Sequence, residues 1–307
     1  MKTDKMKNYL VAPLMILAYF GLVSVISLAA GEGIFTVINY IYVGFFASLG
    51  MYLYAKFPKK KKTRARRISM FAIGGLLFLA MGVMGRIDGQ LEGFFFYGLA
   101  GITAGTVSHY IIAKIIGPFF LNRGWCGWGC WTIMILDLFP YKRTERKLPE
   151  KFGWIRYAHF VFSLVLVMIL WFGFDYSISR EKWDIAGMYW FLGGNTIYSV
   201  IGISLVLFLK DNRAFCKYVC PVSIFLQLSS RISLLRIKGE KELCDECDAC
   251  NKTCPMNIPI TYYILSEKRV LSSECVMCLT CINSCPTNAI SVSIGLDFGK
   301  TIYASTK

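Results

Sequence analysis

The sequence predicts an α-helical membrane protein with six transmembrane helices and a C-terminal cytoplasmic α+β domain. Three observations lead to this fold class. The 307 residues are 55% hydrophobic and 17% charged, whereas soluble domains are about 25% charged. Six apolar stretches are long enough to cross about 30 Å of hydrocarbon. Beyond residue 233 the chain becomes polar, and eight of its 12 cysteines gather there.

The six predicted spans divide the chain into three regions. The first span follows three lysines and resembles a signal peptide, but its apolar run is longer than the 7–15 residues of a signal core, so we expect a retained helix. Residues 1–67 form an N-terminal helix pair with a polybasic loop, residues 68–233 form the membrane domain, and residues 234–307 form the polar domain. The predicted spans are residues 9–30, 34–55, 68–85, 94–116, 154–174 and 190–209.

The placement of lysine and arginine predicts the orientation, because these residues are enriched in cytoplasmic loops. With the N-terminus inside, all but three of the 34 Lys and Arg residues fall on inner segments, and the exceptions are Arg86, Arg180 and Lys182. We therefore expect a multi-pass protein of the cytoplasmic (inner) membrane, with both termini and all cysteines on the cytoplasmic side. The polybasic run 59–67 would attract anionic lipid head groups. Because membrane helices flank this run, we expect no nucleic-acid partner.

The polar domain carries two complete C-x2-C-x2-C-x3-C-P runs. This pattern is typical of proteins with two [4Fe–4S] clusters, in which the fourth cysteine of each run binds the other cluster. A pair of zinc knuckles would not need eight cysteines in this order. We therefore predict a double-cluster ferredoxin-like domain, with strands near residues 234–237 and 289–294. The first ligand set is Cys244, Cys247, Cys250 and Cys285, and the second is Cys275, Cys278, Cys281 and Cys254.

The other four cysteines form two C-x3-C pairs in an internal repeat with an offset of 90 residues, Cys126/Cys130 and Cys216/Cys220. Each pair follows a predicted inward-running helix, so we expect the pairs at inner helix ends. On a helix, this spacing places both sulfurs on one face. Four thiolates are enough for one shared metal site. A third iron–sulfur cluster is the leading interpretation, and copper, redox dithiols, zinc and structural cysteines remain alternatives.

Arginines precede both pairs, and Arg123 and Arg213 are placed to offset the negative charge of a thiolate-bound cluster. Thiolate clusters also require a reducing compartment, which agrees with the cytoplasmic orientation.

Other cofactor motifs are absent from the sequence. It contains no C-x-x-C-H haem-attachment site, no glycine-rich dinucleotide fingerprint and no P-loop. A haem between His109 and His159 is therefore disfavoured. Ionisable groups inside membranes are functional candidates, and we consider His109, Lys114, Arg156 and His159 as candidates for a quinone pocket.

The cysteine pattern from residue 121 to residue 294 resembles the membrane-bound polyferredoxins. Relatives in that family include the quinol-dehydrogenase subunit serving periplasmic nitrate reductase, the membrane half of the nitrous-oxide reductase maturation flavoprotein, and the copper-reducing cytochrome oxidase assembly factor. The family's short motif is C-x3-C-P. The second copy keeps it with Pro221, whereas the first has Trp131 in that place. The resemblance implies electron transfer at a membrane.

The leading functional hypothesis is an electron-transfer subunit of an oxidoreductase system. It would relay single electrons between a cytoplasmic redox donor or the quinone pool and a membrane or extracytoplasmic partner protein. One alternative is a copper (metal) reductase or assembly factor that uses Cys126, Cys130, Cys216 and Cys220. Another alternative is an iron–sulfur redox sensor.

Overall fold

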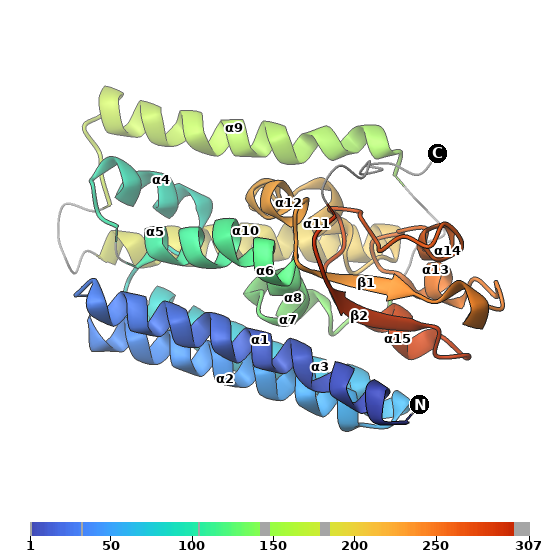
Figure 1. The fold of residues 1–307 in the computed structure, drawn as a ribbon. Helices are drawn as coiled ribbons and strands as arrows, with labels where there is room; N and C mark the ends of the chain where they lie inside the picture. The colour runs from blue at the N-terminus through green and yellow to red at the C-terminus, as the bar shows by residue number, and fades with distance from the viewer. Residues whose placement is uncertain (1, 32, 104, 142–147, 179–184, 298–307) are drawn as a thin grey trace.

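The computed structural model describes residues 2–31, 33–103, 105–141, 148–178 and 185–297. The predicted outer residues Arg180 and Lys182 lie outside these ranges. Long helices run side by side, and the polar C-terminal region lies at one end of them, beside the N-terminus (Figure 1). The α-helices are α1 (Lys2–Ala29), α2 (Ile34–Lys56), α3 (Lys62–Leu77), α4 (Leu91–Leu99), α5 (Thr106–His109), α6 (Gly117–Leu121), α7 (Gly124–Trp128), α8 (Trp131–Leu136), α9 (Ile155–Met168), α10 (Ile185–Leu209), α11 (Ala214–Tyr218), α12 (Ser223–Ser230), α13 (Ala249–Thr253), α14 (Ile260–Leu265) and α15 (Thr280–Ser284).

Three of these helices continue into wider π-helical turns. Such turns follow α3 at Phe78–Met84, join α5 to α6 at Tyr110–Ile116, and follow α9 at Ile169–Gly173. Short 3-10 turns lie at Lys59–Lys61, Glu150–Trp154 and Lys241–Leu243.

Five helical stretches among the described residues are long and apolar enough to cross a membrane. Many of their apolar side chains point away from the protein, and Leu22, Phe162 and Phe208 are 59%, 63% and 76% exposed. Such an exposed apolar surface is stable only in contact with lipid, so the chain is a membrane protein. The stretches are Leu10–Ala29, Ile34–Lys56, Lys62–Met84, Lys151–Gly173 and Ile185–Leu209.

The prediction of one continuous helix over residues 94–116 is wrong. The chain forms α4 and, after a break, continues as the shorter apolar stretch Thr106–Leu121. The break contains Gly101 and Gly105, whose φ angles are 72° and 68°. Glycine adopts this left-handed conformation at little cost, whereas other residues are strained by it. The segment is apolar throughout, so its hydropathy did not indicate the break at these two glycines.

The polar domain begins with β1 (Leu235–Gly239) and ends with β2 (Ile290–Ile294), which pair antiparallel from Leu235 opposite Ile294 to Gly239 opposite Ile290. The two predicted strands are therefore confirmed. The cysteine runs lie between them, together with the short helices α13, α14 and α15. Closing the segment with paired strands brings both cysteine runs together (Figure 1).

Candidate metal centres and the adjoining cavity

The four C-x3-C cysteines line one pocket between α7, α8 and α11. Cys126 lies on α7 and Cys216 on α11, and both are buried. Both short helices end before the second cysteine of the pair. The expectation that each pair lies on one continuous helix is therefore wrong, but the repeat brings the two pairs together as predicted.

The two copies fold locally in the same way. The side-chain oxygen of Asn122 accepts a hydrogen bond from the backbone N–H of Arg123 at 2.8 Å, and Asp211 does the same for Arg213 at 2.8 Å. Side-chain acceptors of this kind satisfy backbone donors at the start of a helix. The N–H group of each arginine is therefore satisfied at the start of its short helix, although the acceptor is one residue before Arg123 and two residues before Arg213.

The C-x3-C loops do not remain at the inner helix ends. A Cβ added to Gly74, in the middle of the Lys62–Met84 stretch, would lie 3.2 Å from the Cα of Trp131. Phe215 packs against Tyr198 with ring centroids 5.3 Å apart, although Tyr198 lies 11 residues before the end of α10. Both loops fold back between the helices, so the four-cysteine pocket lies deeper than predicted.

Positive charge surrounds this pocket. Arg123 and Arg213 are 0% and 1% exposed, and Lys114 also lines the pocket. Nε and Nη2 of Arg123 and Nε of Arg213 are buried without a hydrogen-bond partner in the described part of the chain. Buried donors without an acceptor are costly. The residues therefore fit an anionic group, as a cluster bound by four thiolates would be.

The second cysteine run of the polar domain lines another pocket. Its three cysteines Cys275, Cys278 and Cys281 share this pocket with Cys254 from the first run. Burial, with a further contribution from the neighbouring Cys278, raises the pKa of Cys254 to about 11. A metal cluster that replaces the thiol proton would compensate the charge of the buried thiolate. The juxtaposition agrees with crossed ligation.

Both cysteine runs curl in the same way. Glu246 and Asp248 in the first run have φ angles of 53° and 59°, and Met277 and Leu279 in the second have 49° and 60°. These non-glycine residues accept strained left-handed conformations. These conformations turn the backbone at matching positions in the two runs. Cys247 of the first run is exposed to solvent, whereas the pocket of the second run is buried.

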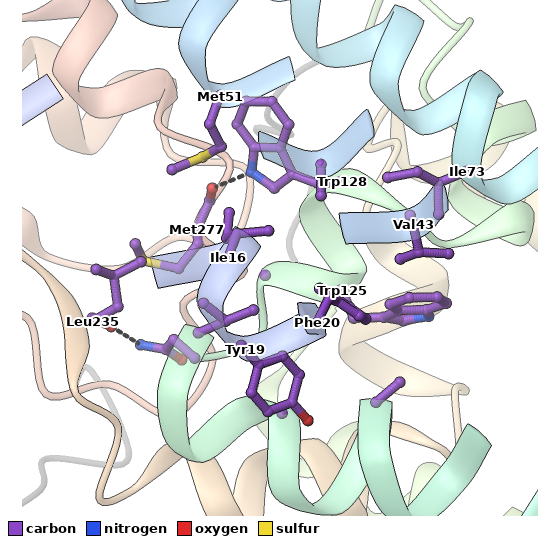
Figure 2. Close-up of a pocket in the computed structure, with 17 residues that line it drawn as sticks. Ile16, Tyr19, Phe20, Val43, Met51, Ile73, Trp125, Trp128, Leu235 and Met277 are labelled. Atoms are coloured by element: carbon purple, nitrogen blue, oxygen red, sulfur yellow. Dashed lines mark hydrogen bonds between the residues drawn. The ribbon is translucent and has the colours of Figure 1, made fainter. Parts of the chain in front are cut away.

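The first C-x3-C loop touches the second cysteine run directly. A Cβ added to Gly127 would lie 2.3 Å from the carbonyl oxygen of Val276. The indole N–H of Trp128 donates to the carbonyl oxygen of Met277 at 2.8 Å, as the dashed line in Figure 2 shows. Trp125 and Trp128 also line a small apolar pocket against α1 and α2. No sequence motif marked Gly127 as a contact residue, although it lies next to Cys126 in the first C-x3-C pair.

Buried polar contacts hold the polar domain against the membrane helices. Glu274 accepts hydrogen bonds from Arg123 at 2.6 Å and from Arg156 at 2.8 Å. Burial alone would raise the pKa of Glu274, but the two arginines lower it, so the carboxylate remains ionised. On the other side, the hydroxyl of Tyr54 donates to the carbonyl oxygen of Leu279 at 2.7 Å. The domain is thus held from two sides.

A cavity of about 410 Å³ lies beside the four-cysteine pocket, between α2, α3 and α5. His109 and Trp125 line its inner wall, with ring centroids 5.0 Å apart. Nε2 of His109 is buried and has no hydrogen-bond partner among the described residues. Trp125 also lines the four-cysteine pocket. One aromatic side chain therefore separates the cavity from the thiols.

The other three candidates for a quinone pocket lie elsewhere. Lys114 lines the four-cysteine pocket, and its Nζ lies 4.1 Å from the centre of the Trp125 ring. Arg156 binds Glu274 and the backbone of Lys217. Nδ1 of His159 is hydrogen-bonded to the carbonyl oxygen of Val219 at 2.9 Å. Of the four, only His109 faces the large cavity.

Two family models match the regions that contain the cysteines. A 4Fe-4S dicluster domain matches residues 236–286. A 4Fe-4S binding domain matches residues 111–148 and 192–239, which contain the two C-x3-C pairs. Among the described residues, no group of three or more His, Cys, Asp or Glu side chains is arranged to hold a single metal ion. No solved structure matches the chain.

Several curated proteins are similar to the chain over somewhat more than half its length. An uncharacterized protein of Methanocaldococcus jannaschii is 27% identical over 190 residues, covering 60% of this chain and 70% of the relative. The electron transport protein YccM of Escherichia coli is 35% identical over 192 residues, covering 57% and 52%. The ferredoxin-type protein NapH of Haemophilus influenzae is 26% identical over 200 residues, covering 60% and 68%.

Together with the membrane helices and the paired cysteine runs, these similarities define an iron–sulfur electron-transport protein of the membrane. The chain fits the membrane-bound polyferredoxin family that its cysteine pattern resembles.

Proposed function

We propose that this chain relays single electrons between a cytoplasmic donor and a quinone in the membrane. Three cysteine sets would hold three [4Fe–4S] clusters along this route, and each cluster supplies a one-electron carrier when bound. The observation that carries the proposal is the contact of Gly127 and Trp128 with Val276 and Met277. It joins the second ferredoxin site to the four-cysteine pocket without an intervening layer of side chains.

The exposure of the cysteines supports an order along this route. Cys247 is exposed, so the set of Cys244, Cys247, Cys250 and Cys285 is the one that a soluble donor can approach. In the set that includes Cys254, three cysteines are buried and Cys278 is partly buried, and this set lies next to the C-x3-C loop. The four-cysteine pocket comes third, and the cavity at His109 follows it.

Two findings favour a cluster over copper at the four-cysteine pocket. The 4Fe-4S binding domain model matches both C-x3-C repeats. The unpartnered N–H groups of Arg123 and Arg213, and the ammonium of Lys114, favour a group with net negative charge.

The His109 cavity supports a quinone as the membrane partner. Its lining is mostly apolar, as a lipid-soluble ring and isoprenoid tail require, and its volume lies in the range of small-molecule sites. The unpartnered Nε2 of His109 can hydrogen-bond to a quinone oxygen and exchange a proton there.

Metal and sulfide analysis of the purified protein tests the cluster assignment. We expect about twelve irons and an equal amount of sulfide per chain. About eight irons with bound copper would favour the metal-reductase alternative. A photoreactive quinone analogue should label peptides that contain Asn39, Tyr40 or Ile102, which line the cavity. Reduced clusters that never pass electrons to quinone would favour the sensor alternative.

A further inference from the structure

The His109 cavity and the ferredoxin sites lie at different depths along one helix. Tyr54, near the C-terminal end of α2, binds Leu279 of the polar domain. Tyr40 of the same helix lines the cavity, and its hydroxyl lies 3.5 Å from Ser108 Oγ, next to His109. Fourteen residues separate the two tyrosines, which corresponds to about 21 Å at a helical rise of 1.5 Å per residue. That is about two-thirds of the hydrocarbon thickness.

The cavity reaches the end of the bundle that lies opposite the polar domain. Phe35 and Thr36 begin α2, and Gly85 and Arg86 follow the end of the Lys62–Met84 stretch. Arg86 is exposed, as a charged side chain at a water or head-group boundary would be. This end of the cavity provides a polar mouth.

The opposite wall of the cavity is apolar. Toward the polar domain the lining consists of Phe20, Val43, Leu77, Ala113 and Trp125. Other polar groups lie in or near the other part, namely Arg86, Thr36, Asn39, Tyr40 and Tyr97, with Asp88 next to Tyr97. His109 lies beside Trp125 at the inner wall, with ring centroids 5.0 Å apart. Lys114 is separated from the cavity by the Trp125 ring. Among the described residues, the polar side chains that could carry protons therefore lie between the mouth and His109, whereas the wall toward the polar domain is apolar.

We infer that electrons and protons reach this cavity from opposite faces of the membrane, so that the reaction is linked to the membrane potential. The inference rests on the proposed function. In the balanced reaction, a quinone accepts two electrons, one at a time, from the polar-domain side and two protons through the mouth at Arg86, and it leaves as quinol. Each electron crosses about two-thirds of the membrane without an accompanying proton from the same side.

Charge separation of this kind predicts a measurable voltage dependence. For a one-electron step, 59 mV changes an equilibrium constant tenfold. The electron crosses about two-thirds of the membrane and the proton from the opposite face crosses the rest, so one full charge crosses the potential and the change is about tenfold per electron. A reaction that took electrons and protons from the same face would show no such dependence.

The experiment uses the full-length protein with its clusters in phosphatidylcholine vesicles that contain menaquinone and a pH-sensitive dye in the lumen. Dithionite is added outside, and molecules with the polar domain facing outward are selected by their reaction with it. We expect the lumen to lose two protons per quinol formed. The quinone/quinol ratio should change about tenfold per electron for each 59 mV of an imposed potassium diffusion potential.

The variant His109→Phe should stop lumenal proton uptake while the visible spectra of the reduced clusters remain unchanged. His159→Phe is the matched control, because the other histidine of the chain lies outside the cavity. Quinol formation with proton loss from the outer medium only would overturn the inference and leave the proposed function intact. Failure to form any quinol, with clusters that still reduce, would overturn both.

Discussion

Trp128 in the first C-x3-C loop donates its indole N–H to the carbonyl oxygen of Met277, which lies between two cysteines of the ferredoxin half, at 2.8 Å. The two residues are 149 positions apart in the chain. Both belong to loops that hold cysteines, so this hydrogen bond fixes the spacing of two candidate metal sites.

Enlarging Gly127 should separate the two loops. In Gly127→Ala the new Cβ would lie 2.3 Å from the Val276 oxygen, so one loop must move. We expect slower electron transfer from the ferredoxin half to the four-cysteine site and a stability loss of about 1–3 kcal/mol from overpacking. Rapid-freeze spectroscopy after mixing with dithionite measures the rate. Gly98→Ala is the control, because its Cβ would meet nothing within 4 Å, and an equal effect in both variants would contradict the prediction.

Crossed ligation predicts the result of replacing the last cysteine of the second run. Cys285→Ser should damage the cluster held by Cys244, Cys247 and Cys250 and leave its neighbour largely intact. The corresponding change Cys254→Ser should damage the other cluster, since Cys254 lines the pocket of the second run. Electron paramagnetic resonance of each reduced variant distinguishes the two. Loss of the cluster nearer in sequence would show that the ligation is not crossed.

A single shared site makes the two C-x3-C pairs interdependent. Replacing either Cys126 or Cys216 with Ser should remove the whole site, because one cluster needs thiolates from both repeats. We expect the iron content to fall from about twelve to about eight per chain, with both ferredoxin signals retained. If each replacement removed only half of the bound metal, the pairs would be independent dithiols.

The buried Asp88 carboxyl should make stability depend on pH. Burial, with a further contribution from Glu92, raises the pKa of Asp88 from 3.8 to about 8. Between these pH values the folded protein binds more protons than the unfolded chain, so stability falls as pH rises from about 4 to about 8. Asp88→Asn should reduce this fall, as measured by thermal unfolding in detergent. The exposed Asp245→Asn serves as a control and should leave the slope unchanged.

The orientation of the chain in the membrane can be tested with reporter fusions near the ends of the membrane helices. A fusion after Lys62 should report a cytoplasmic location and a fusion after Gly31 an external one, because basic residues concentrate on the side of Lys62. Reversal of both reporters would place the cysteines in the oxidising compartment, where thiolate clusters are not maintained.

The sequence alone determined the composition of the sites and the class of the protein. Ligands of one cluster lie close together in the sequence, so the cysteine spacing of the two runs predicted the double-cluster domain. The pairing of β1 with β2 agrees with this prediction. Hydropathy likewise identified five of the six spans, because the bilayer imposes a length on each helix.

The tertiary structure decided the relationships that depend on distant segments. The fourth predicted span is broken at Gly101 and Gly105. Average hydropathy did not indicate this break, because it carries no information about backbone turns. In the folded chain, the C-x3-C loops pack between the helices, Gly127 contacts Val276, and His109 lines a cavity. Each of these results depends on packing between residues far apart in the chain, and periodicity and spacing within one segment carry no information about such packing.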